Sequence, residues 1–86
     1  MEREEDLFAT EWDNLTTNQR KVLKLIVEKN GQNLYDEKAL AKYEIKVGSL
    51  RKILQILLDK DIIYKTEDRY YLQDPLFKYW LKQRIY

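Results

Sequence analysis

Apolar residues recur at helical spacing over most of the chain and alternate with polar residues in one short region near the C-terminal end. At the N-terminal end, a leading helix is predicted over residues 7–15. The apolar residues of this segment fall near one side of a helix and are Leu7, Phe8, Trp12 and Leu15. We expect this side to pack on the rest of the chain, with Trp12 in the core.

A second helix is predicted to begin after Thr16. Thr16 can cap this helix, and Gln19, three residues later, can complete a capping box. A broad apolar stripe follows over residues 22–27. Asn30-Gly31 is expected to end the helix, because glycine accepts the left-handed backbone conformation that is common after helix ends.

Two further helices are predicted in the middle of the chain. The first is brief, with Asp36 as its cap and an end near residue 42 or 43. A compact link follows, in which Ile45 and Val47 are expected to turn inward. The second helix runs from about residue 48 to about residue 60, and its apolar face consists of Leu50, Ile53, Leu54, Leu57 and Leu58.

The pattern then changes from helical to alternating. Residues 62–66 and 69–72 are rich in β-branched and aromatic side chains, and Glu67-Asp68 separates them, which predicts a β-hairpin. Asp74-Pro75 starts a final helix well, because Asp caps and Pro fits the first helical position. The apolar stripe of this helix consists of Leu76, Phe77, Trp80 and Leu81.

This order of elements, three helices with short connections and then a hairpin, is that of a winged helix-turn-helix. The predicted fold is therefore mainly α with a small β-hairpin: a three-helix core plus a wing, with extra helices at both ends. Residues 1–15 are expected to form a leading helix that packs on the domain. Residues 16–86 are expected to form the winged-helix domain with its C-terminal helix.

Three stretches of the chain carry a resemblance to a known family. They are Leu15-Thr16 with Gln19 and Leu23-Lys24-x-Ile26; Gly48-Ser49-Leu50-Arg51-Lys52 with residues 57–64; and, most specifically, Tyr71-Leu72-x-Asp74-Pro75-Leu76-Phe77-x-x-Trp80-Leu81. With these residues the chain resembles, from about Trp12 to Trp80, the C-terminal winged-helix domains of prokaryotic AAA+ ATPases of the archaeal, STAND-like type. The resemblance implies a detached accessory module that contacts the ATPase domain of its own parent chain. The nucleotide-binding motifs of the family are absent from this chain, so no ATP site is implied.

The composition excludes most catalytic chemistry. The chain contains no Cys and no His, which removes thiol nucleophiles, the commonest general base and the commonest metal ligand. With only Gly31 and Gly48 as glycines, neither a phosphate-binding loop nor a dinucleotide fingerprint can be formed. We expect no enzyme, no catalytic residue, no metal and no cofactor. No apolar run is long enough for a membrane span and the acidic start does not fit a signal peptide, so a cytoplasmic protein is expected.

Charge is unevenly distributed along the chain. The net charge is +1, but residues 1–13 carry −5 and the remaining residues +6. A mildly basic body permits contact with phosphate groups. One hypothesis is therefore that double-stranded DNA binds to the third core helix and the wing, through Lys46, Ser49, Arg51, Lys52, Gln55, Lys65 and Arg69. The same mixture of residues is also typical of a solvated helix face.

A protein-interaction or regulatory module, without DNA binding, is the alternative hypothesis. The partner would be the ATPase domain, another protein or a second copy bound through the terminal helices. The last helix has more rings than a small core readily hides, and its interface candidates are Tyr79, Trp80 and Tyr86. For Trp80, core packing is the competing expectation.

Overall fold

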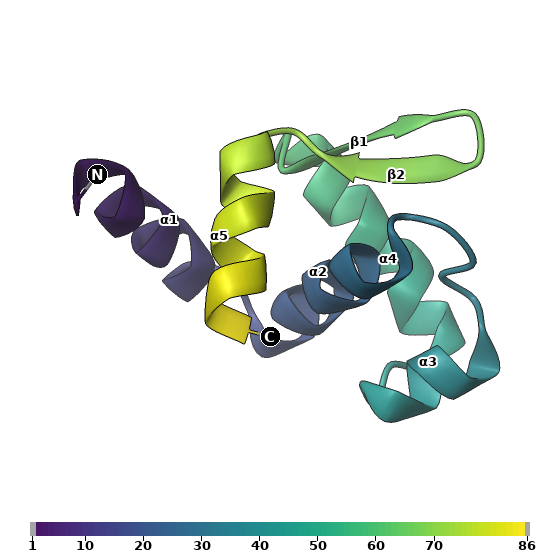
Figure 1. Ribbon diagram of the computed structural model, residues 1–86. Helices are drawn as coiled ribbons and strands as arrows, with labels where there is room; N and C mark the ends of the chain where they lie inside the picture. Colours follow the sequence, from purple (N-terminus) through teal and green to yellow (C-terminus); the bar gives the residue numbers. More distant parts are fainter. Residues whose placement is uncertain (1, 86) are drawn as a thin grey trace.

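The computed structural model describes residues 2–85, and the side chains of residues 7–84 among them. These residues form α1 (Glu2–Asp13), α2 (Thr17–Lys29), α3 (Glu37–Lys42), α4 (Val47–Asp59), β1 (Ile63–Thr66), β2 (Arg69–Leu72) and α5 (Pro75–Ile85). Helices α2, α3 and α4 form the core, the antiparallel hairpin β1–β2 follows α4, and α1 and α5 lie together at the other end of the molecule (Figure 1). This architecture confirms the predicted fold class.

Helix α2 begins and ends where the sequence predicts. The backbone N–H of Gln19 donates to Thr16 Oγ1 at 3.1 Å, and the backbone N–H of Thr16 donates to Gln19 Oε1 at 3.1 Å, which completes the capping box. At the other end Asn30 has φ 55° and Gly31 φ 77°, and the N–H of Gly31 donates to the carbonyl of Ile26. Both residues therefore have the left-handed backbone conformation, so the chain leaves α2 in a sharp turn toward the hairpin.

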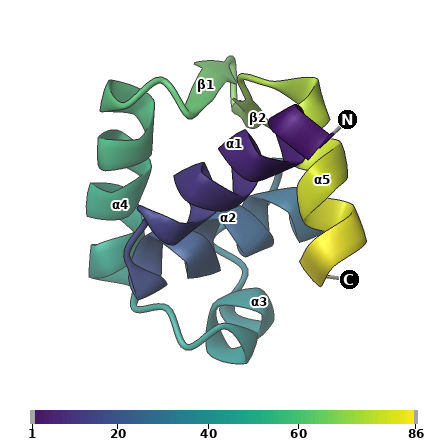
Figure 2. The same ribbon diagram turned by 90° about the vertical axis from the view of Figure 1, so that its left-hand side faces the viewer.

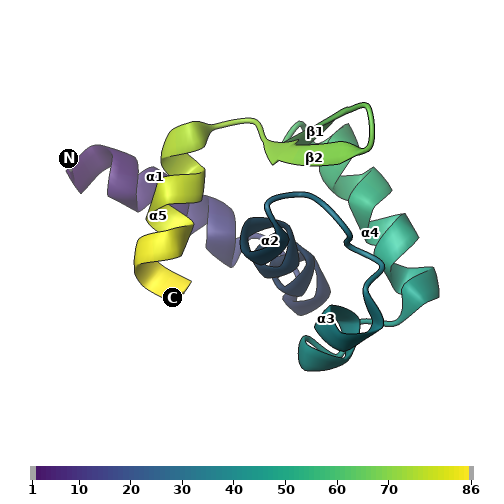
Figure 3. The ribbon, with the colours of Figure 1, turned by 45° about the vertical axis from the view of Figure 1, so that its right-hand side comes forward.

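The core is a single cluster of buried apolar side chains. Helix α2 is central in it, because α4 packs on one side of α2 and α5 on another (Figure 3). Phe77 is among the largest of the fully buried side chains. The buried members are Leu15, Val22, Leu23, Leu25, Ile26, Val27, Leu34, Ala39, Leu40, Leu50, Ile53, Leu54, Leu57, Ile62, Ile63, Leu72, Phe77 and Leu81.

Helix α1 is joined to the domain by aromatic contacts and by one arginine. The ring of Phe8 lies 5.3 Å from that of Phe77 and 6.2 Å from that of Trp80, measured between centroids. Arg20 of α2 donates from Nε to the carbonyl of Trp12 and from Nη2 to the carbonyl of Asp13, at 3.0 Å each. Carbonyls at the end of a helix lack intrahelical donors, so Arg20 satisfies two of them where α1 ends. Figure 2 shows α1 crossing in front of α2, with α5 to one side.

Three apolar side chains that the sequence pattern predicts to face the core are exposed to solvent instead. Leu7 is 65% exposed, Val47 57% and Leu76 54%. Helices α1 and α5 lie at the edge of the core, so their buried stripes are narrower than the apolar stripes in the sequence. Val47 is the first residue of α4 and precedes its first buried position, Leu50. The predictions for these three side chains were wrong.

Candidate nucleic-acid interface

Helix α4 presents a polar face to solvent because its apolar residues are confined to one side. Its buried residues Leu50, Ile53, Leu54 and Leu57 follow the spacing of one helix face. Arg51, Lys52 and Gln55 fall on the other side and are exposed. Lys46, at the N-cap of the helix, is exposed, and Ser49 is half-buried. The structure thus places the predicted helix residues together on α4, with Ser49 at the margin of the exposed face.

The cations at the beginning of α4 have no carboxylate partner among the described residues. The ion pairs found within residues 7–84 are Lys29–Asp36 and Lys42–Glu28, and neither includes Lys46, Arg51 or Lys52. Three positive charges without a carboxylate partner among the described residues therefore lie at the N-cap and in the first two turns of α4. At the other end of the helix, Gln55 Nε2 donates to Asp59 Oδ1 at 3.0 Å. The exposed face of α4 is therefore positive at its beginning and negative at Asp59, and Gln55 is hydrogen-bonded to the negative end.

The two basic residues of the wing lie on opposite faces of the hairpin. The register pairs Lys65 with Tyr70 and Thr66 with Arg69, and neighbouring pairs in a hairpin point to opposite sides. Lys65 is exposed, with Nζ 5.3 Å from the centroid of the Tyr70 ring. Its face continues the buried pair Ile63–Leu72 outward from the core. Lys65 therefore remains available to a ligand.

Arg69 is held by other parts of the protein. Its Nε donates to the carbonyl of Asn30 at 3.0 Å, and its Cζ lies 5.3 Å from the centroid of the Tyr71 ring. Tyr71 in turn stacks on Tyr64 across the hairpin, with a centroid distance of 5.2 Å. These contacts tie the wing to the end of α2, so Arg69 has a structural role whatever else it contacts. Sequence reasoning missed it because Asn30 and Arg69 are far apart in the chain.

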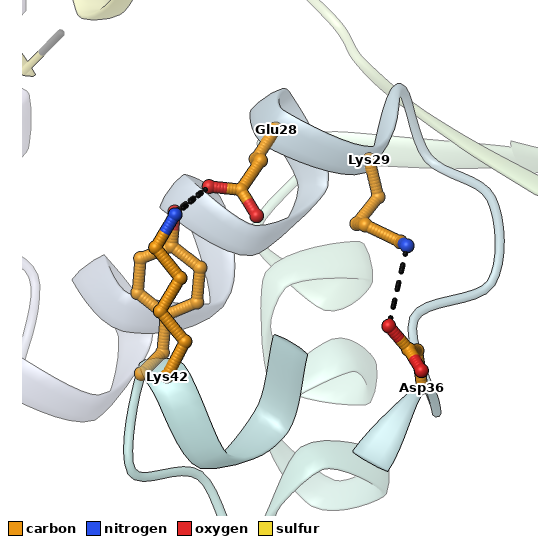
Figure 4. A network of polar contacts seen from close by, with 5 residues as sticks. Glu28, Lys29, Asp36 and Lys42 are labelled. Carbon is orange, nitrogen blue, oxygen red and sulfur yellow. Dashed lines mark hydrogen bonds and ion pairs between the residues drawn. The ribbon is translucent and has the colours of Figure 1, made fainter. Parts of the chain in front are cut away.

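Two ion pairs join the end of α2 to α3 and to the residue before it. Asp36, which precedes α3, accepts a contact from Lys29 Nζ at 3.5 Å, and Lys42 Nζ donates to Glu28 Oε1 at 2.6 Å (Figure 4). Tyr43 also donates to Glu28 Oε1, at 2.7 Å. The hydrogen bonds from Lys42 and Tyr43 lower the pKa of Glu28 below its ordinary value. The side chain of Asp36 makes no capping hydrogen bond, so the predicted cap is present by position only.

The wing overhangs an open concavity that the sequence pattern did not reveal. It has a volume of about 700 Å³ and lies between the loop after α2 and the inner face of the hairpin. Two lysines and two aspartates line it together with two tyrosines, so its charges balance. The lining residues are Lys29, Gly31, Asn33, Leu34, Tyr35, Asp36, Lys65, Asp68 and Tyr70. A second pocket, of about 200 Å³, lies at the beginning of α4 and includes Lys46 and Ser49.

The three predicted protein-interface residues differ in their surroundings. Tyr79 is 64% exposed on α5. Trp80 is half-buried and packs against the rings of Phe8 and Phe77, and its Nε1 is buried without a hydrogen-bond partner among the described residues. Tyr86 lies outside the described residues. The buried Phe77 and the half-buried Trp80 match the expectation that these rings pack in the core. Of the two described interface candidates on α5, Tyr79 is the exposed one.

The described residues contain no group of three acidic, His or Cys side chains that could hold a metal ion. Within the same part of the chain, no helix has both the length and the apolar character needed to cross a membrane. Among protein families, a model described as a probable winged helix domain matches residues 6–83. No curated protein and no solved structure gives a significant match to the chain.

Proposed function

The chain belongs to the family of probable winged helix domains, and from this membership we propose that it is a non-catalytic accessory domain that binds double-stranded DNA through α4 and the wing. Lys46, Arg51 and Lys52 would contact the DNA at the beginning of α4, and Lys65 would contact it from the wing. Ser49 and Gln55 would lie within reach of the same groove. Arg69 would support the wing and leave the contact with phosphate to Lys65.

One observation carries this proposal: the cations of α4 are not neutralised. Lysines 29 and 42 face carboxylates, whereas Lys46, Arg51 and Lys52 face solvent without an ion pair among the described residues. Unpaired cations on one helix face can replace the counterions that surround a phosphate backbone. The first turns of the helix would therefore lie nearest the DNA. Asp59 would keep the other end of α4 away from phosphate groups and would hold Gln55 unless a base edge offers it a better partner.

A fluorescence-polarisation titration with a mixed-sequence duplex, at low and at moderate salt, tests the proposal. Removing two phosphate contacts in Arg51→Ala/Lys52→Ala should weaken binding and make the slope of log affinity against log salt shallower by about two. The matched control, Lys82→Ala/Arg84→Ala, removes the same charge from α5 and should leave the slope unchanged. If both double variants lost the same amount of DNA affinity, the loss would be an effect of net charge and not of contacts made by α4. Absence of binding at low salt would contradict DNA binding and favour a protein-interaction module.

As a second part of the proposal, the domain is the C-terminal module of a larger prokaryotic AAA+ ATPase of the STAND-like type and acts in the cytoplasm. Support comes from the resemblance over residues 12–80, most specifically from the Asp74-Pro75 helix start and the aromatic residues that follow it. The module would then contact the ATPase domain of its own chain. Sequencing the natural gene upstream tests whether the domain belongs to a larger ATPase. A Walker A lysine and a Walker B strand encoded in frame would support this, and their absence would contradict it.

A further inference from the structure

The beginning of α4 lacks the residues that usually stabilise the beginning of a helix. Its N-cap is Lys46, where Ser, Thr, Asn and Asp are preferred, and the Lys46 side chain makes no capping hydrogen bond with the described residues. The first turn contains no acidic residue to interact with the positive end of the helix dipole. Helix α2, by contrast, has a complete capping box at Thr16 and Gln19, and α3 has Glu37 in its first turn. Helix stability therefore does not explain the residues at the beginning of α4.

Gly48, the second residue of α4, is not required by the backbone or by packing among the described residues. Of the two glycines in the chain, Gly31 has a positive φ and Gly48 does not. A Cβ atom on Gly48 would meet no atom within 4 Å. Inside a helix glycine is less favourable than alanine, because its backbone loses more freedom on folding. Glycine is also the residue that lets a ligand approach the backbone closely, and the space in front of Gly48 is open to such an approach.

Val47 places an apolar side chain beside this open space. It is the first residue of α4 and is more than half exposed. Arg51 follows Val47 by four residues and Lys52 follows Gly48 by four, so each cation is a neighbour of one of them on the helix surface. Both cations are exposed and have no carboxylate partner among the described residues. An exposed valine and a glycine thus lie at the beginning of a positively charged surface.

We propose that Val47 selects thymine through contact with its 5-methyl group in the major groove, and that Gly48 lets α4 come close enough for this contact. The inference rests on the proposed DNA binding by α4 and adds a base preference to it. In helix-turn-helix complexes the N-terminal residues of the recognition helix contact base edges. In the major groove thymine presents a methyl group, which apolar side chains contact. Arg51 and Lys52, one turn further along, contact phosphate groups.

Val47 can distinguish bases where its charged neighbours cannot. The cations of α4 can be satisfied by any sequence, because every nucleotide carries a phosphate. Gln55 could pair with adenine, but its side chain donates to Asp59. A valine side chain gains nothing from a phosphate group, whereas its contact with a methyl group removes apolar surface from water. The exposed valine therefore fits a thymine and adds sequence information to a surface that otherwise recognises charge.

Replacing thymine by uracil tests the contact, because the two bases differ in this methyl group alone. A preferred duplex is selected from a library with randomised base pairs, and each of its thymines is then replaced singly by uracil. At one position the replacement should weaken binding of the parent chain about fourfold, as expected for one methyl group lost from an apolar contact. In Val47→Ser the same replacement should leave the affinity unchanged. The matched control is Ile56→Ser, which alters another partly exposed apolar residue of α4 and should keep the fourfold difference.

Gly48→Gln tests the close approach of α4 to the bases. The new side chain would enter the open space in front of the helix and hold the bases away from Val47. Affinity for the selected duplex should fall about fourfold or more, and the difference between thymine and uracil should disappear. Circular dichroism melting should show an unchanged or higher melting temperature, because glutamine favours a helix more than glycine does and its Cβ atom meets no protein atom.

The outcomes separate this base preference from DNA binding itself. A parent chain that tolerates uracil at every position would overturn the inference, and so would a thymine preference that persists in Val47→Ser. In both cases DNA binding would stand, because the salt-dependent affinity for a mixed-sequence duplex does not depend on Val47. Unchanged affinity in Gly48→Gln would contradict the role of Gly48. Absence of binding to any duplex would contradict both proposals.

Discussion

Gly31 and Tyr70 lie so close together that a Cβ atom on Gly31 would be 1.8 Å from the carbonyl oxygen of Tyr70. The N–H of Tyr70 donates to the carbonyl of Gly31 at 3.1 Å, so the wing packs on the end of α2 through backbone atoms. Gly31 also has φ 77°, a conformation that residues with a side chain rarely adopt. The position of the wing therefore depends on the absence of a side chain at residue 31.

Gly31→Ala should destabilise the protein by about 3 kcal/mol, because it adds both a backbone penalty and a clash with Tyr70. Gly48→Ala is the matched control, since a Cβ atom there meets nothing within 4 Å. It should leave stability unchanged or raise it by up to about 1 kcal/mol, as alanine is the better helix former. Urea denaturation measures both. Similar losses in the two variants would contradict the account of Gly31.

The two basic residues of the wing should respond differently to removal. Arg69→Ala should cost about 1–2 kcal/mol of stability, because a charge-assisted hydrogen bond to the carbonyl of Asn30 is lost. Lys65→Ala should change stability by less than about 0.5 kcal/mol, as expected of an exposed side chain. In the duplex titration, Lys65→Ala should instead make the salt dependence shallower by about one. The reverse assignment of effects would show that Arg69 is the wing residue that binds phosphate.

Thr16→Ala should cost about 1 kcal/mol of stability, because the first turn of α2 loses the hydroxyl that accepts from the N–H of Gln19. Thr17→Ala removes a similar hydroxyl one residue later, inside the first turn, where it caps nothing. The loss there should be less than about 0.5 kcal/mol. Thermal melts of the two variants, followed by far-UV circular dichroism as a measure of secondary structure, compare them. A larger loss in Thr17→Ala would show that the capping box does not stabilise α2.

Stability should fall with acid in a way that depends on Glu28. Its pKa is lowered in the folded state by hydrogen bonds from Lys42 and Tyr43. A lowered pKa means that the folded state favours the ionised form, so this stabilisation is present above the ordinary value of 4.5 and is lost as the pH falls through the folded-state pKa. Glu28→Gln should be less stable than the parent at neutral pH, and the difference should shrink below that range. Urea midpoints across the acidic range measure it, with Glu37→Gln on α3 as the control. A constant difference would mean that ionisation of Glu28 does not matter.

Local sequence signals predicted the elements well because they act within a few residues. Thr16 and Gln19 set the start of α2, and Asp74 with Pro75 set the start of α5. The helical period also identified Arg51, Lys52 and Gln55 as the outer side of α4. It failed at Leu7 and Leu76, because the period gives the width of an apolar stripe and says nothing of how much of it a neighbouring helix covers.

The details of the candidate interface depend on contacts between distant segments. That Lys65 and Arg69 lie on opposite faces follows from the register of the hairpin. The sequence pattern placed both residues on the wing as DNA contacts and assigned neither to a face. No local sequence signal predicts the hydrogen bond from Arg69 Nε to the carbonyl of Asn30, because the two residues are far apart in the chain. The free state of Lys46 depends on which carboxylates the fold brings near it, which no local pattern specifies.

The bond between Tyr70 and Gly31 also bears on how the hairpin meets other chains. A two-stranded sheet has two edges whose unpaired backbone groups can recruit a strand from another molecule, and such edges are a common route to aggregation. Here the short loop at Gly31 occupies the edge of β2 without forming a strand of its own. Because a Cβ atom would push that loop away, a single glycine limits strand addition at the wing to the edge of β1.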